Sequence, residues 1–210
     1  MKVTEVRGVT GSWGLAAQPE DYDGFPPLGR ILFDREPHRA SPDRVALASY
    51  LFFGKHASAN FETPSWHSPA LAQAMARDAD PVWLQTKPVE LYAMPLPMGR
   101  RSVVVSLEDV ASVPSQVHST TDFELTFSRS DLSSGSRLSF DSMELSTNAW
   151  LSALDRSADE RIRIVLGCGV LFAADVDGDE LNVSRLGVSD AAAQSMIALL
   201  GAVRLGLRLV

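Results

Sequence analysis

Apolar and polar residues alternate in short runs through the middle of the chain, and this period of two predicts β-strands. The clearest runs are Glu124–Phe127 and Leu138–Leu145, which are separated by the Ser- and Gly-rich residues 133–136. Alternation of this kind is typical of strands with one buried face and one wet face. We therefore expect an antiparallel mid-chain sheet whose strands cover residues 82–85, 89–95, 102–107, 123–128 and 137–145.

Two Ser-Pro pairs, at Ser41 and Ser68, mark predicted helix starts, because a serine hydroxyl caps the first turn and proline fits inside it. The helix after Ser41 is apolar on nearly every side through Phe53, which indicates a buried central helix, and Gly54 is expected to end it in a left-handed conformation. The helix after Ser68 is Ala-rich and extends to about Arg77.

Two further helices are predicted toward the carboxyl end. Asn148 is expected to cap one that runs to about Ser157, and Ser189 begins the last one, which carries an apolar stripe. Between them, the β-prone residues 162–174 predict a buried strand that bends at Gly167 or Gly169. The Asp177-Gly178 pair that follows favours a hairpin turn into a returning strand over residues 180–185.

The chain begins with a predicted strand over residues 2–7, followed by a long irregular loop over 8–29 and a short strand over 30–34. Trp13, Tyr22 and Phe25 are expected to pin that loop against the protein. The resulting fold class is α+β, with the antiparallel sheet packed against three to four helices. We expect one domain over residues 1–210, with a weak possible subdivision near residues 108–122, and no internal repeat of about 20–50 residues is visible.

Composition excludes several functional classes. A net charge of −7 argues against a nucleic-acid platform, since phosphate binding depends on clustered Lys and Arg. The single cysteine, Cys168, excludes an internal disulfide. No apolar run is long enough to span a membrane, and residues 1–8 do not resemble a secretory signal. A cytoplasmic protein is expected.

Two short motifs near residue 170 are incomplete. Asp175, Asp177 and Asp179 have the spacing that opens an EF-hand calcium loop, but Glu180 and Leu186 occupy the positions of its glycine and its bidentate acid. Gly167 and Gly169 match two glycines of a dinucleotide loop, whose third position is Phe172. We predict neither a metal nor a cofactor, and we expect Cys168 to pack as a small apolar residue.

One stretch between the two best-defined helices gathers groups that bind ligands. It is expected to be a loop, and it combines two histidines with an acid, an amide and an indole: His56, Asn60, Glu62, Trp66 and His67. If a ligand pocket exists, it is predicted here, because functional groups concentrate on loops held by rigid elements. The alternative is a surface connection whose Phe61 and Trp66 cover the core.

The last residues are apolar, with Leu205, Leu207 and Leu209 in alternate positions. They require cover from their own domain or from a second copy of the chain, so they are a candidate interface. The functional prediction is a non-catalytic interaction or accessory subunit of a cytoplasmic assembly, with a protein partner or self-association and without nucleic acid or membrane. The alternative is an enzyme or small-molecule-binding protein with its pocket near residues 56–67.

Overall fold

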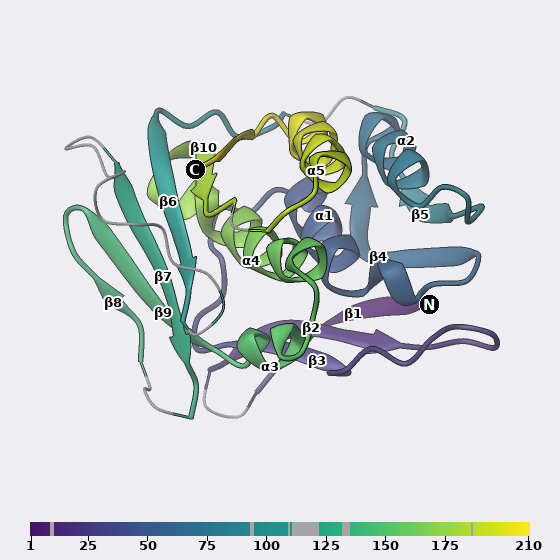
Figure 1. The fold of residues 1–210 in the computed structure, drawn as a ribbon, viewed down its shortest axis with the longest axis horizontal. Helices are drawn as coiled ribbons and strands as arrows, with labels where there is room; N and C mark the ends of the chain where they lie inside the picture. The colour runs from purple at the N-terminus through teal and green to yellow at the C-terminus, as the bar shows by residue number, and fades with distance from the viewer. Residues whose placement is uncertain (9–10, 93–94, 109, 111–121, 132–134, 186) are drawn as a thin grey trace.

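The computed structural model describes residues 1–8, 11–92, 95–108, 110, 122–131, 135–185 and 187–210. Its strands form one mixed sheet in the order β11-β10-β6-β7-β9-β3-β2-β1-β4-β5, with β8 beside β9. The sheet curves around the helices α1 and α4, which lie in its hollow (Figure 1). A shared apolar core fills the space between them, with the aromatic rings of Phe33, Phe127 and Phe172 in mutual contact.

The amino-terminal half of the sheet begins as an antiparallel meander and continues with parallel strands. The meander pairs β1 with β2 and β2 with β3, and β4 and β5 then add in parallel beside β1. Its elements are β1 (Lys2–Arg7), β2 (Trp13–Gln18), β3 (Arg30–Phe33), α1 (Pro42–Phe53), the 3-10 helix η1 (Gly54–His56), β4 (Asn60–His67), α2 (Pro69–Asp78) and β5 (Gln85–Val89).

The carboxyl-terminal half pairs β6, β7, β9, β10 and β11 in parallel, with only β8 antiparallel to β9. Its elements are β6 (Arg101–Leu107), β7 (Phe123–Arg129), β8 (Arg137–Leu138), β9 (Ser142–Thr147), α3 (Ala149–Ala153), α4 (Ala158–Phe172), the 3-10 helix η3 (Ala173–Val176), β10 (Gly178–Val183), α5 (Asp190–Ala202) and β11 (Gly206–Leu209).

The two halves repeat one arrangement. The strand order β3-β2-β1-β4-β5 of the first half matches β9-β7-β6-β10-β11 of the second, with α1 corresponding to α4 and α2 to α5. The halves meet where β3 pairs antiparallel with β9 through Phe33 and Thr147, as expected for two units related by a twofold axis. The match is incomplete, because β2 is antiparallel to β1 whereas β7 is parallel to β6.

Local contacts repeat as well. Ser41 and Ser157 cap α1 and α4 by accepting the backbone N–H three residues later. Two residues after each cap, Asp43 and Asp159 accept the backbone N–H of Ser68 and Ser189, at 2.6 Å and 2.8 Å. Each of these aspartates therefore ties the start of one helix to the capping serine of the next helix in the same half.

The α+β class is confirmed, but the predicted antiparallel mid-chain sheet is wrong, because the sheet is mostly parallel. Residues 101–107 and 123–129 are strands as predicted, yet they run side by side in the same direction. The meander lies instead at the amino terminus, where β2 occupies part of the segment predicted to be a long irregular loop over 8–29. Strand direction depends on which strands pair across the sheet, and alternation within a strand carries no information about that.

The buried strand predicted over residues 162–174 is also wrong, since these residues form most of α4 and the start of η3. The deciding signal is the capping box at Ser157 and Glu160, whose side chains each bond the backbone of the other residue. The expected hairpin turn is also wrong, because Asp177 ends η3 with a φ of 60° and Gly178 begins β10. The length of α4 is a second signal, because its fifteen residues exceed the usual length of a strand and favour a buried helix.

Three of the other predicted helices are confirmed, because those after Ser41, Ser68 and Ser189 all begin at those caps. The helix predicted from Asn148 to about Ser157 is shorter, since α3 ends at Ala153, and the Asn148 side chain makes no capping hydrogen bond. Gly54 plays a different part from the one expected, since its φ of −59° is right-handed. It is required because a Cβ there would lie 2.2 Å from the ring of Tyr50. Most of the predicted subdivision near 108–122 lies outside the described residues.

Candidate functional site

The residues predicted to form a pocket are divided by strand geometry. Residues 60–67 form β4, so successive side chains point to opposite faces of the sheet. Asn60 and Trp66 are exposed, whereas His67 is fully buried on the core side. The structure therefore places these side chains on different faces.

His67 is held inside the protein by two threonines. Its Nδ1 lies 3.0 Å from the Thr63 hydroxyl and its Nε2 lies 2.9 Å from the Thr86 hydroxyl. Burial lowers the pKa of His67, which favours the neutral ring. With both ring nitrogens bonded within the sheet, His67 connects β4 to β5.

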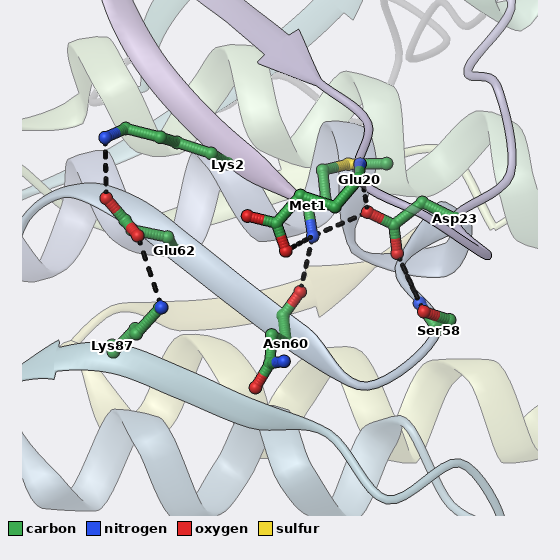
Figure 2. Close-up of polar contacts among 8 residues, drawn as sticks. All are labelled: Met1, Lys2, Glu20, Asp23, Ser58, Asn60, Glu62 and Lys87. Atoms are coloured by element: carbon green, nitrogen blue, oxygen red, sulfur yellow. Dashed lines mark hydrogen bonds and ion pairs between the residues drawn. The ribbon is translucent and has the colours of Figure 1, made fainter.

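Asn60 and Glu62 belong to a network of polar contacts at the amino terminus, shown in Figure 2. The Met1 ammonium donates to the Asn60 backbone carbonyl at 2.7 Å and pairs with Asp23 at 2.6 Å, with Glu20 at 3.6 Å. Glu62 bridges Lys2 and Lys87 at 3.0 Å and 3.4 Å, which joins β1, β4 and β5. These groups satisfy one another, so the arrangement links β1, β4 and β5 to the β2–β3 connection that carries Asp23.

Asp23 is the centre of that network. It accepts the backbone N–H groups of Glu20 and Ser58 in addition to the Met1 ammonium. Burial opposes its ionisation, but the hydrogen bonds from the ammonium and the two backbone groups outweigh burial and lower its pKa to about 2. The contact with Ser58 also anchors the β2–β3 connection beside η1.

His56 alone among the predicted residues lines a surface depression. The depression lies where the end of α1 and η1 meet the start of α4, and its lining is Pro27, Leu51, Phe52, Lys55, His56, Ser152, Arg156, Glu160, Arg163 and Ile164. Burial, followed by the positive charge of Arg156, lowers the pKa of His56. Arg156 pairs with Glu160 at 3.5 Å, while Lys55 is exposed at the rim.

Arg163, at the base of the depression, belongs to a buried network that joins four helices. It donates to both carboxylate oxygens of Asp78, at 3.1 Å and 2.7 Å. Asp78 also accepts from Tyr50 at 2.5 Å and from Ser195. Burial opposes ionisation of Asp78, but the hydrogen bonds from Arg163, Ser195 and Tyr50 lower its pKa overall. The charge of Arg163 is therefore compensated inside the protein.

Exposed aromatic side chains lie near the amino terminus, and two of them, Tyr22 and Phe25, were expected to pin the 8–29 loop against the protein, which their exposure contradicts. Tyr22, Phe25 and Trp83 are 95%, 86% and 80% exposed. Tyr22 and Phe25 flank Asp23, and Trp83 lies two residues before Gln85, whose N–H bonds the Ala59 carbonyl next to Ser58. We call these three residues the aromatic end. The depression adjoins it, because Gly24 donates to the His56 carbonyl at 2.7 Å and Pro27 lines the depression.

The carboxyl-terminal tail is covered largely by its own chain. Leu205 is buried, and Leu207 and Leu209 are half-buried on β11, an edge strand paired with β10. A subunit contact through the exposed part of this strand remains a prediction.

The two incomplete motifs have structural positions. Asp175 accepts the backbone N–H groups of His38 and Arg39 at 3.1 Å and 2.7 Å, which ties η3 to the segment before α1. In the described part of the chain, no group of three His, Cys, Asp or Glu residues has the arrangement of a metal site. Gly167 packs against the Phe52 ring, and burial raises the pKa of the Cys168 thiol.

The sequence patterns did not single out three charged residues whose side chains lie inside the protein: Arg44, Asp78 and Arg163. A charged residue within an otherwise apolar helix was the available signal, since such residues are rarely buried without a partner. Comparison with protein families, with curated proteins and with solved structures gives no match. None of the described helices combines the length and the apolar character needed to cross a bilayer.

Proposed function

We propose that this protein is a non-catalytic interaction or accessory subunit of a cytoplasmic multi-protein assembly, and that the aromatic end contacts its partner. The observation that carries the proposal is the exposure of Tyr22, Phe25 and Trp83 in one region. Aromatic residues are enriched at protein interfaces, where large rigid rings bury much area at little entropic cost. Large exposed apolar groups that gather in one region also mark interaction sites.

The partner contact extends naturally into the depression. Phe25 and Pro27 belong to the same connection, and Pro27 lines the depression together with Leu51 and Phe52. A partner that covers the aromatic end therefore also meets the depression, whose lining includes Lys55 and Arg156. Exposed aromatic side chains beside charged ones have the composition expected of a specific interface.

The test is co-purification of a complex from the native host, with the tagged chain captured and the complex mass measured. The triple variant Tyr22→Ser, Phe25→Ser, Trp83→Ser is compared with the control Leu138→Ser, Phe140→Ser, in which Phe140 is 91% exposed but lies beside β8. We expect the wild-type and control chains to retain the same stoichiometric partner and the triple variant to lose it. A monomeric wild-type chain, or a triple variant that keeps the partner, contradicts the proposal.

A second function, small-molecule binding or catalysis, is favoured by the depression that His56 lines. Under this alternative, Lys55→Ala and His56→Ala abolish ligand binding, whereas the triple variant of the aromatic end retains it. Ligand-induced protection from hydrogen exchange at residues 51–56 and 156–164 distinguishes the two functions, because a protein partner also protects residues 22–27.

A further inference from the structure

Among the residues that the structure describes, Arg44 is a buried cation without an anionic partner. Its side chain lies in the first turn of α1 with a relative exposure of 0%. Neither Nε nor Nη1 has a hydrogen-bond partner, and Nη2 donates to the Pro97 carbonyl at 3.4 Å. That distance exceeds the usual range of about 2.7–3.2 Å. Burial alone lowers the pKa of Arg44, to about 10.

A comparison with Arg163 shows that the charge of Arg44 is not compensated. Both arginines are buried, but Arg163 makes two hydrogen bonds to the Asp78 carboxylate. The hydrogen bonds and charge of Asp78 raise the pKa of Arg163 despite burial, whereas no such compensation acts on Arg44. A charge transferred from water to a protein interior is costly unless it is paired and bonded.

The segment that contacts the Arg44 guanidinium contains two prolines. Residues 95–98 follow β5 on the way to β6, and Met98 is exposed. Pro95 and Pro97 have no backbone N–H, so neither can donate a backbone hydrogen bond. Beyond them the chain is fixed firmly, because Arg100 and Arg101 both donate to the Asp177 carbonyl. Movement at Pro97 would remove its carbonyl from the Arg44 guanidinium while Arg100 and Arg101 stay bonded to Asp177.

We propose that Arg44 is the anchor of a binding site for a small oxyanion, either a phosphate or a carboxylate, which replaces the Pro97 carbonyl as its partner. A planar guanidinium donates two parallel hydrogen bonds to either group, and such charge-assisted bonds are stronger than neutral ones. The positive end of the α1 dipole adds to the attraction for an anion. The site is independent of the aromatic end and of the depression.

The experiment measures thermal unfolding at constant ionic strength and pH 7, with inorganic phosphate or succinate at low millimolar concentration against a chloride background. The wild-type chain is compared with Arg44→Met and with Arg77→Met, which removes the same charge from an exposed position on α2. An anion at about ten times its dissociation constant multiplies the ratio of folded to unfolded wild-type chain by about ten. Arg77→Met should respond equally.

Two results for Arg44→Met support the site: a midpoint above that of the wild-type chain without anion, and no response to the anion that shifts the wild-type midpoint. A response to phosphate but not succinate assigns the site to phosphate, and the reverse assigns it to carboxylate. The proposal is overturned if neither anion shifts the wild-type midpoint beyond chloride, or if Arg44→Met responds as strongly as the wild-type chain.

Discussion

The two ends of the α1–α4 helix pair differ in how the protein treats buried charge. The helices run in opposite directions, so the start of each lies beside the end of the other. Where α4 begins, Arg163 is neutralised by Asp78, and Lys55 and His56 border an open depression. Where α1 begins, Arg44 is enclosed without a carboxylate.

The internal repeat makes this difference informative. Counted from the capping serines Ser41 and Ser157, Lys55 and His56 occupy the helical positions of Leu171 and Phe172, which are fully buried. By the same count Arg44 corresponds to Glu160, which lines the depression. At the start of α1 a cation is enclosed, whereas the start of α4 borders a surface depression lined by both charged and apolar residues. Equivalent positions of α1 and α4 therefore carry different side chains, and the two candidate sites lie at opposite ends of this helix pair.

The largest expected effect comes from removing the compensating charge. Asp78→Ala leaves Arg163 buried without a carboxylate and also removes an acceptor from Tyr50 and Ser195, so it should destabilise the protein by about 3–5 kcal/mol. Urea unfolding measures the loss. Asp179→Ala, at an exposed carboxylate on β10, is the control and should change stability by less than about 0.5 kcal/mol. Equal effects of the two variants contradict the compensation of Arg163.

A pH dependence is expected from Asp23. Its folded pKa of about 2 lies below the usual 3.8, so its contribution to stability is complete above pH 4 and is lost as the pH falls toward 2. The contribution amounts to about 2 kcal/mol. Asp23→Asn should lower stability at neutral pH and should flatten the pH dependence between pH 4 and 2. Urea midpoints measured across that range decide the point, and a variant with an unchanged slope contradicts the role given to Asp23.

The two aspartates that repeat between the halves should have similar effects. Asp43→Ala and Asp159→Ala each remove a carboxylate that accepts a capping serine N–H, and each should cost about 1 kcal/mol. Asp43 is buried and Asp159 is partly exposed, so the first loss should be the larger. Thermal unfolding of both variants tests the equivalence of the halves. If only one of the two variants loses stability, the halves share a backbone arrangement but the two aspartates do not contribute equally to stability.

The smallest effect is expected at the open end. His56 has a half-buried ring, and burial and Arg156 lower its pKa, so the neutral ring is already favoured at pH 7. His56→Ala should change stability by less than about 0.5 kcal/mol. Calorimetric unfolding at pH 7 measures this. A much larger loss would indicate that the depression is part of the core and not a binding surface.

Local signals in the sequence predicted the starts of helices better than they predicted which strands pair in the sheet. Serine caps predicted the starts of three helices correctly. The capping box at Ser157 and Glu160 also indicates the start of α4, although the isoleucines that follow favour a strand. Parallel pairing of β6 with β10 joins segments that lie far apart in the chain, so no local pattern reveals it. The predicted pocket residues were divided for a simple reason: a strand over residues 60–67 sends neighbouring side chains to opposite faces.

The contrast between the two buried arginines is tested most directly by urea unfolding of Arg44→Met and Arg163→Met under identical conditions. Arg44→Met should raise the free energy of unfolding by about 1–4 kcal/mol, because an apolar side chain replaces an uncompensated charge. Arg163→Met should lower it by about 3–5 kcal/mol, because Asp78 then stays buried without its partner. Losses of similar size in both variants would contradict the account, since Arg44 would then be compensated as fully as Arg163.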